Sequence, residues 1–211
     1  MNNNMLEYEE ELYNSGYKLI AGIDEVGRGP LVGPVVTACV ILPVGFYHKD
    51  IKDSKLLSEK KRNEMTKLIK ENAICYSVGV IDAKTIDKVN ILNATVLAMK
   101  QSIDNMKIKP DYILIDAVKL DISIPSTSII KGDQKSESIA AASIIAKVYR
   151  DEIMYELDLL YPNYNFRSNK GYGTREHMNA IKEYGVIKEH RRSFRPVREE
   201  EAKRLGSTKI C

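Results

Sequence analysis

Hydrophobic residues occur along this chain in two kinds of run. Short runs rich in β-branched residues end at glycine, proline or acidic residues, which is typical of buried strands. We expect five such strands, over residues 18–24, 35–42, 73–81, 111–116 and 126–133. A stretch rich in glycine and proline separates the first two, so we expect them to pair as an antiparallel hairpin.

Longer segments carry apolar residues at helical spacing, with polar residues between them. Ser58 precedes one of these segments at the N-cap position, where its hydroxyl can accept a backbone N–H. The pattern predicts a short acidic helix within residues 1–17 and helices over residues 58–72, 85–106, 136–161 and 174–184. We expect the polar stretch 162–173 to be a loop and the basic stretch after Tyr184 to be irregular.

Predicted strands and helices alternate after the hairpin, which favours an α/β fold with a mixed sheet flanked by helices. The helical segments beyond the last strand predict a C-terminal helical appendage. We therefore expect three parts: a short helical extension over residues 1–17, an α/β core over 18–160, and a basic appendage over 161–211 that packs on the core.

Composition fits an ordinary globular domain. The chain has 211 residues, of which 44% are hydrophobic and 29% charged, enough to bury a core without disulfides. Cys39, Cys75 and Cys211 show no paired spacing, so we expect small core residues in a reducing compartment and no zinc site. The N-terminus lacks the features of a secretory signal, and no apolar run approaches the ~18 residues of a membrane span. We expect a cytoplasmic monomer that does not contact membranes.

The charge is distributed unevenly along the chain. The net charge is only +3, but residues 167–211 contain 12 Lys/Arg against 6 Asp/Glu, a net of +6. Residues 1–166 contain 20 basic and 23 acidic residues, a net of −3. This asymmetry suits a polyanionic partner bound beside an acidic centre, although a solvated basic tail explains the charge equally well.

Four acidic residues stand where a predicted strand ends or a tight loop begins: Asp24, Glu25, Asp116 and Asp133. Strand ends of one sheet meet in a crevice, where gathered carboxylates raise one another's pKa unless a cation neutralises them. Magnesium takes oxygen ligands of this kind, and two metals about 4 Å apart form a known arrangement for phosphoryl transfer. The alternative for each residue alone is a turn residue or a helix cap.

Glycines flank Arg28 directly after the first two acids. Gly27 and Gly29 let the backbone approach a ligand closely or take a positive φ. The spacing matches neither a dinucleotide-binding loop nor a Walker phosphate loop. Backbone groups here could reach a ribose 2′-hydroxyl, the group by which proteins distinguish RNA from DNA. A segment this short is more often a simple turn.

Six successive motifs resemble those of bacterial ribonuclease HII. They are AGIDEVGRGPLVGPVV, KDSKLLS, ILIDAV, KGDQKSESIAAASIIAKVYRD, SNKGYGT and HRRSFRPV, which occur in order over residues 18–198. The resemblance implies a ribonuclease H-like fold and hydrolysis, dependent on magnesium or manganese, of RNA paired with DNA. It also implies nicking 5′ of single ribonucleotides embedded in duplex DNA, which leaves 5′-phosphate and 3′-hydroxyl ends. An RNA–DNA hybrid or ribonucleotide-containing duplex is therefore the expected partner.

The resemblance carries roles over to matching positions. The acidic residues become ligands of two divalent cations when substrate is bound: Asp24, Glu25, Asp116 and Asp133. The Gly27-Arg28-Gly29 segment reads the 2′-hydroxyl through its backbone, and Tyr172 stacks beside the junction nucleotide. Weaker candidates could contact the phosphate of the cleaved strand: Lys135, Ser136 and Lys170. The weakest could instead pair with neighbouring acids: Lys55, Arg191 and Arg192.

Other titratable residues have no expected part in the chemistry. Asp151 and Glu152 fall in the middle of the predicted helix 136–161, where we expect a solvated face or an ion pair with Lys147. A two-metal mechanism requires no histidine as a general base, so we expect His190 to be structural, and His177 is not needed.

Three alternative functions are compatible with the same acidic residues or the same fold. A metal-dependent phosphotransferase or nuclease acting on small substrates could use the same acids. A non-catalytic nucleic-acid-binding module could carry them as structural residues. Ribonuclease HIII usually carries a substantial N-terminal substrate-binding domain, for which the 23 residues before Asp24 leave no room. The sequence does not distinguish magnesium from manganese, or long hybrids from single ribonucleotides as the main substrate.

Overall fold

The computed structural model describes residues 4–52 and 54–207. Within it the chain divides into two compact units, each with its own hydrophobic core. Unit 1 contains the chain up to residue 26 and residues 36–80 and 96–148. Unit 2 contains residues 27–35 and 81–95 and the chain from residue 149 onwards. The predicted boundaries after residues 17 and 160 stay predictions.

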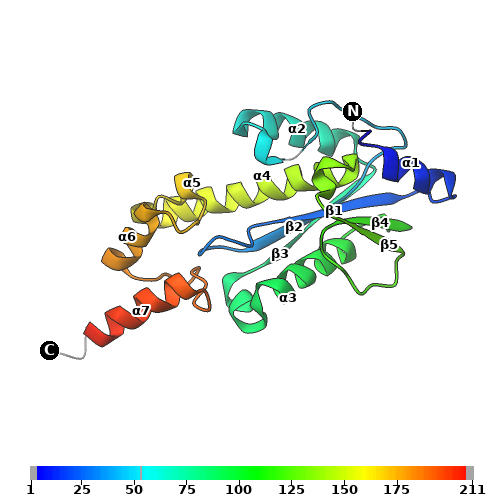
Figure 1. The fold of residues 1–211 in the computed structure, drawn as a ribbon. Helices are drawn as coiled ribbons and strands as arrows, with labels where there is room; N and C mark the ends of the chain where they lie inside the picture. Colours follow the sequence, from blue (N-terminus) through cyan, green and yellow to red (C-terminus); the bar gives the residue numbers. More distant parts are fainter. Residues whose placement is uncertain (1–3, 53, 208–211) are drawn as a thin grey trace. The chain divides into compact units, whose positions relative to one another are not determined.

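The five predicted strands are all present. They are β1 (Ile20–Val26), β2 (Val35–Ile41), β3 (Cys75–Ile81), β4 (Tyr112–Asp116) and β5 (Ser126–Ile129). They form one sheet in the order β3-β2-β1-β4-β5, as Figure 1 shows. β1 pairs antiparallel with β2 and parallel with β4, which in turn pairs parallel with β5. The predicted hairpin and the mixed sheet are therefore confirmed.

The five predicted helices are also present. The structure contains α1 (Glu7–Asn14), α2 (Glu59–Asn72), α3 (Ala83–Asp104), α4 (Glu137–Leu160), α5 (Phe166–Asn169), α6 (Arg175–Tyr184) and α7 (Arg195–Ser207). Short 3-10 helices are η1 (Ser54–Leu56), η2 (Gly132–Gln134) and η3 (Pro162–Tyr164). Ser58 caps α2 as expected, since its hydroxyl accepts the Lys61 N–H at 3.3 Å.

Four details of the sequence prediction were wrong. β1 continues two residues beyond Asp24, and β5 stops at Ile129 because Lys131 adopts the left-handed conformation at φ 56°. The expected loop 162–173 contains η3 and α5. The charged end of the chain, for which no helix was expected, forms α7, which lacks the clear apolar stripe that would have revealed it.

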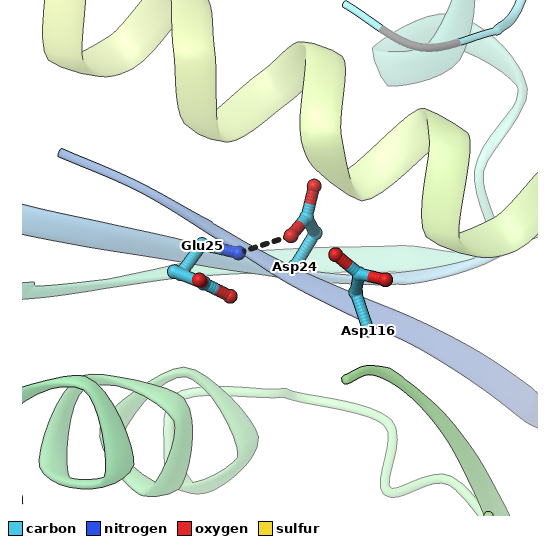
Figure 2. A group of neighbouring side chains, drawn as sticks. All are labelled: Asp24, Glu25 and Asp116. Atoms are coloured by element: carbon cyan, nitrogen blue, oxygen red, sulfur yellow. Dashed lines mark hydrogen bonds between the residues drawn. The ribbon is translucent and has the colours of Figure 1, made fainter. Parts of the chain in front are cut away.

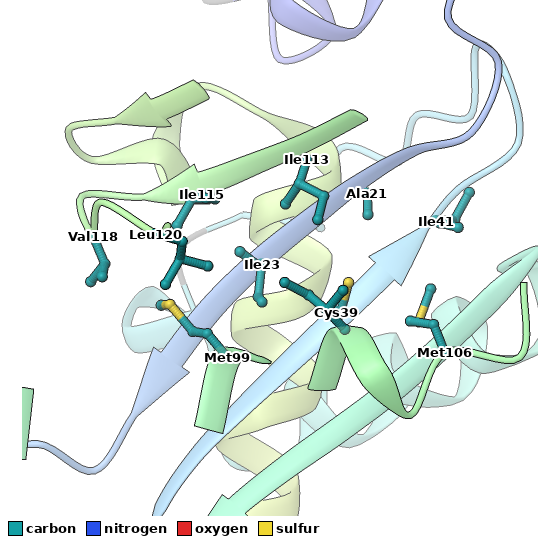
Figure 3. Close-up of a cluster of buried hydrophobic side chains, with 11 residues drawn as sticks. Ala21, Ile23, Cys39, Ile41, Met99, Met106, Ile113, Ile115, Val118 and Leu120 are labelled. Carbon is teal, nitrogen blue, oxygen red and sulfur yellow. The ribbon is translucent and has the colours of Figure 1, made fainter. Parts of the chain in front are cut away.

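Each face of the sheet in unit 1 packs against a helix. Side chains of a strand alternate between the two faces, so Ala21 and Ile23 join a cluster with Met99 of α3 (Figure 3). Ile20 lies on the other face and packs with Ile139 of α4. The alternation in β1 thus fixes which side chains face α4.

Two glycines allow these helices to lie close to the sheet. A Cβ added to Gly22 would lie 2.0 Å from the backbone carbon of Ser138 in α4. A Cβ added to Gly79 would lie 2.0 Å from the carbonyl oxygen of Ala98 in α3. Only hydrogen fits at either position, so the glycines set the distance between sheet and helices.

The cysteine predictions have different outcomes. Cys39 is fully buried in the core of unit 1 and free, as expected. Cys75 is free but only half buried at the start of β3. Cys211 lies outside the described residues. Among the helices of 4–52 and 54–207, none combines the length and apolar character that a membrane crossing requires.

The core of unit 2 is built mainly from α4, α5 and α6. Its buried apolar residues are Leu31, Val32, Met154, Leu157, Tyr164, Phe166, Ala180, Ile181 and Val197. In this unit α3 is interrupted at Asn90, which has φ 66° and ψ 167°. The Asn90 side chain accepts the Asn93 N–H at 3.1 Å and so caps the continuation of the helix.

The close approach at Gly22 generates a stability prediction. Replacing Gly22 with alanine forces α4 away from β1, and overpacking of this kind costs about 3 kcal/mol. Thermal and denaturant unfolding should show this loss. Gly206→Ala is the control, because nothing lies within 4 Å of a Cβ there and the substitution should change stability by less than about 0.5 kcal/mol. Equal stability of the two variants would contradict the packing described.

Candidate active site

The carboxylates of Asp24 and Asp116 lie beside each other because their strands run parallel in register. Ile23 pairs with Ile115 across β1 and β4, and the same register continued by one residue sets Asp24 next to Asp116. Both strands end within two residues of these acids. The strand pairing thus brings acidic residues together at the strand ends, as the sequence predicted.

Glu25 completes a group of three. One carboxylate oxygen from each of Asp24, Glu25 and Asp116 lies within 4.8 Å of the others. Figure 2 shows Asp24 and Asp116 on the side of helix α4, with Glu25 on the next position of β1. The Glu25 N–H donates to Asp24 Oδ1 at 2.6 Å, which orients the central carboxylate.

Asp24 is buried, and its carboxylate lies beside two other acids. Its side chain is 5% exposed, and the loss of solvation raises its pKa well above the ordinary value for aspartate. The negative charges of Glu25 and Asp116 raise the pKa further, while hydrogen bonds from the Ser143 hydroxyl and the Glu25 N–H lower it. Oxygen donors this close repel each other unless a cation lies among them, so the donor set fits a hard divalent metal such as Mg²⁺ or Mn²⁺.

Ser143 is a contributor that sequence analysis missed. It lies on α4, is 5% exposed, and its hydroxyl donates to Asp24. A second hydroxyl, of Ser54, lies 3.0 Å from Ser143 Oγ and extends the hydrogen-bonded chain. In the sequence Ser143 is one small residue among alanines of a helix, and only the close approach at Gly22 brings that helix within reach.

Asp133 is not a member of the three-residue group. It is 5% exposed on η2, and Lys55 Nζ lies 3.9 Å from its carboxylate. The turn it occupies is tied to the cluster, because the neighbouring Gly132 N–H donates to Asp116 Oδ1 at 2.7 Å. Its role as a metal ligand stays a prediction. Asp53, in the KDSK motif, lies outside the described residues.

The candidates after Asp133 differ in exposure. Lys135 is exposed, as a phosphate contact requires. Ser136 is fully buried, and its hydroxyl donates to the buried Glu9 of α1 at 2.6 Å and accepts the Ile139 N–H at 3.2 Å. These bonds hold the start of α4, so we replace the predicted phosphate contact of Ser136 with this structural role.

The Gly-Arg-Gly segment belongs to unit 2, together with Tyr172. Gly27 is buried with φ +95°, a conformation that favours glycine, whereas Arg28 and Gly29 are exposed. A Cβ on Gly29 would lie 3.4 Å from Cε1 of Tyr172, whose side chain is 48% exposed. The loop and the tyrosine therefore present a shared surface to solvent.

Lys170 Nζ lies 3.7 Å from the centre of the Tyr155 ring.

Arg191 and Asp151 in unit 2 differ from expectation. The Arg191 guanidinium donates hydrogen bonds to carbonyls of the Gly27–Gly33 loop, and Arg150, which carried no expectation, makes similar bonds. Both side chains are buried. Asp151 is 4% exposed, so the predicted solvated face is wrong for it, whereas Glu152 is exposed.

Two histidines form a buried pair in unit 2. His177 Nδ1 donates to the Tyr172 carbonyl at 2.9 Å, and His190 Nδ1 accepts the Ile187 N–H at 2.9 Å. The remaining contact, 3.1 Å between the two Nε2 atoms, then requires His190 as donor and both rings neutral. Burial lowers both pKa values, that of His190 to about 3. This arrangement agrees with a structural role.

Comparisons with known proteins agree with this geometry. The sequence matches the family model described as Ribonuclease HII over residues 21–197. Ribonuclease HII of Caldanaerobacter subterraneus subsp. tengcongensis is 55% identical over 188 residues, which cover 89% of this chain and 78% of that protein.

Solved structures share the fold. The ribonuclease H2 of Pyrococcus horikoshii OT3 superposes with a TM-score of 0.75 and 26% identity, covering 87% of this chain and 97% of that one. Bst-RNase HIII in complex with Mn²⁺ has a TM-score of 0.68 and 18% identity, covering 89% of this chain and 70% of that one. The second likeness concerns the fold alone.

Repulsion within the carboxylate group generates a prediction about stability without metal. Asp116→Asn keeps an oxygen that can accept the Gly132 N–H but removes one negative charge. In the presence of a chelator this variant should be more stable than the wild type by about 1 kcal/mol, the equivalent of roughly one pKa unit. Added Mg²⁺ or Mn²⁺ should raise the melting temperature of the wild type but not of the variant.

Asp111→Asn is the matched control. Asp111 precedes β4, and its carboxylate accepts the Lys18 and Leu19 N–H groups at 2.8 and 2.9 Å, away from the three-acid group. This substitution should reduce stability and leave the metal response intact. A chelated Asp116→Asn protein that is less stable than the wild type would contradict the repulsion.

Proposed function

This chain belongs to the ribonuclease HII family, and we propose that it nicks duplex DNA 5′ of embedded ribonucleotides as well as cleaving RNA–DNA hybrids. As a ribonuclease H it is an endonuclease that uses divalent metal ions and acts on RNA paired with DNA. The observation that carries the proposal is the group of Asp24, Glu25 and Asp116, with one oxygen of each within 4.8 Å.

These three residues are proposed to hold the cations, with Asp133 completing the set when substrate binds. The small oxygen-only donor set suits Mg²⁺, and the Mn²⁺ complex of Bst-RNase HIII favours manganese as an alternative. Divalent cations bound there supply an activated water and neutralise charge that develops on the phosphate. Products would carry 5′-phosphate and 3′-hydroxyl ends.

The protein's own contribution is to orient the ligands before substrate arrives. The Glu25 N–H and the Ser143 hydroxyl fix the Asp24 carboxylate, and the Gly132 N–H fixes that of Asp116. Ligands held in this way need little rearrangement during the reaction, which is the basis of electrostatic preorganisation.

Selection of ribonucleotides is proposed to reside in unit 2. Gly27, Arg28 and Gly29 would contact the 2′-hydroxyl through their backbone, since a ribose hydroxyl is both donor and acceptor. The exposed ring of Tyr172 would stack beside the junction nucleotide. Lys135 and Lys170 would serve as point charges for phosphates.

Family membership bears on the alternatives as well. It excludes a non-catalytic nucleic-acid-binding module, because the family is enzymatic. Cleavage of free nucleotide phosphates is tested by assaying such compounds beside a hybrid of RNA and DNA. A monomeric state and a cytoplasmic location stay predictions.

Cleavage of a duplex that contains one ribonucleotide tests the proposed function. The wild type should nick it 5′ of the ribonucleotide with Mg²⁺ or Mn²⁺, as read by mapping labelled product ends. Asp116→Asn should lose cleavage by at least about 1,000-fold, because cation charge stabilises the transition state. Its affinity for the duplex should change little, and Asp111→Asn should retain activity. Near-normal metal-dependent cleavage by Asp116→Asn would remove the site assignment.

Tyr172→Ala tests the stacking role. Loss of stacking on one nucleotide is worth about 1–3 kcal/mol, so kcat/KM for the single-ribonucleotide duplex should fall roughly 10- to 100-fold. Tyr184→Ala is the control, since both tyrosine side chains are 48% exposed in unit 2. Similar kcat/KM values for the two variants would refute the junction-reading role of Tyr172.

A further inference from the structure

Two buried arginines bind the loop of unit 2 that contains the Gly-Arg-Gly segment. We propose that Arg191 and Arg150 are positioning residues that turn the carbonyls of this loop inward and so present its N–H groups to the ribose 2′-hydroxyl. The inference rests on the proposed function of the segment. It assigns a role to two side chains that face away from solvent.

Arg191 binds both ends of the loop. Its side chain is 0% exposed, and Nη2 and Nη1 donate to the carbonyls of Gly27 and Arg28 at 2.6 and 3.0 Å. Nε donates to the Gly33 carbonyl at 2.9 Å. A single guanidinium thus spans both ends of a tight loop, which a lysine with one compact charge cannot reproduce.

Arg150 holds the end of the loop and the turn before Tyr172. It is 1% exposed and donates to the carbonyls of Val32, Pro34 and Lys170 at 3.0 to 3.1 Å. A Cβ on Gly27 would lie 2.3 Å from Arg150 Nε, so glycine is required there for space as well as for its positive φ.

Because these carbonyls point inward, the N–H groups of the same peptide units point outward. The structure has no cis peptide bonds among its described residues, and in a planar trans peptide the C=O and the following N–H point in opposite directions. With the Gly27 and Arg28 carbonyls turned toward Arg191, the N–H groups of Arg28 and Gly29 point the other way. Arg28 and Gly29 are exposed residues, so this orientation directs the two successive donors toward the surface of unit 2.

The same bonds join the loop to the tyrosine. Arg150 contacts Lys170 as well as Val32 and Pro34, and the Leu31 N–H donates to the Gly171 carbonyl at 2.7 Å. The donors and the Tyr172 ring are consequently held within one hydrogen-bonded assembly. A shift in Arg191 or Arg150 would change both parts of the reading surface.

Burial of two like charges has an energetic cost that simple packing would avoid. Loss of solvation lowers the pKa of Arg191 to about 9 and that of Arg150 to about 10, and the charge of Arg150 lowers the pKa of Arg191 further. Both remain protonated at neutral pH. An apolar residue would fill the same space without this cost, so the carbonyl bonds are the feature that requires arginine.

Arg191→Ala is the direct test, assayed on the single-ribonucleotide duplex. Without the Arg191 guanidinium the N–H groups of Arg28 and Gly29 lose their fixed direction. Misplacement of a positioning group by about 1 Å costs roughly 100-fold in kcat. KM should change by less than about threefold, because the exposed cations that attract the duplex are untouched. Hydrogen exchange should accelerate in peptides covering residues 27–34 and 170–174 and stay unchanged in β1 and β4.

Arg204→Ala is the matched control. Arg204 Nη1 also donates to two carbonyls in unit 2, of Lys182 and Glu183 at 2.9 and 3.1 Å, but these end α6 rather than the loop. Its removal should leave kcat and the exchange of residues 27–34 as in the wild type. An equal loss of kcat in this variant would show that any lost guanidinium–carbonyl bond has the same effect, and would overturn the proposal.

Arg191→Lys keeps the test decisive if the alanine variant does not fold. It retains the charge and most of the volume but cannot bridge three carbonyls, so an intermediate loss of about tenfold in kcat is expected. Wild-type kcat in the lysine variant, or a loss of kcat without faster exchange in residues 27–34, would overturn the proposal. Failure of the wild type to nick the duplex would instead overturn the proposed function. The hydrogen-exchange data would still test whether Arg191 and Arg150 hold the loop.

Discussion

Mutual repulsion of three carboxylates is the constraint around which unit 1 is organised. The negative charges of Glu25 and Asp116 and the burial of Asp24 together raise the pKa of Asp24. A protein could relieve the repulsion by letting the side chains move apart. Here backbone and hydroxyl donors hold them, so the energetic conflict is kept for a divalent metal to resolve.

Holding these carboxylates together requires a rigid support, namely the close packing of α4 on β1 that Gly22 allows. Gly22 brings the backbone of α4 against β1, and one helical turn beyond the contact Ser143 reaches Asp24. A longer side chain at position 22 would move the helix and withdraw the hydroxyl. The support also has a cost in stability, as is usual where functional groups are held in unfavourable surroundings. Close packing at Gly22 is thus what allows Ser143 to hydrogen-bond to the Asp24 carboxylate.

Sequence patterns predicted the strands, most helices and the acidic strand ends, because these depend on local periodicity and on the rule that parallel strand ends meet. They failed where burial depends on a distant partner. Ser136 was expected at the surface, yet Glu9, 127 residues earlier in the chain, covers it. Asp151 was expected on a solvated face or in an ion pair with Lys147, and it is 4% exposed. The partners of Arg191 and Arg150 could not be predicted, since they are carbonyls that every residue carries.

The two units solve opposite versions of one problem. In unit 1 negative side chains are held together, in an arrangement that could hold a cation. In unit 2 the groups to be aimed belong to the backbone of a glycine-flanked loop, where Gly27 and Gly29 offer no side chains to pack. At these two positions the chain can be oriented only through its backbone N–H and C=O groups. A guanidinium has five donors, no acceptor and a charge that persists at a pKa of about 9, so it binds several carbonyls and leaves the N–H groups for the ligand. The buried arginines would therefore serve the proposed reading of a hydroxyl as the acids would serve the proposed binding of a metal.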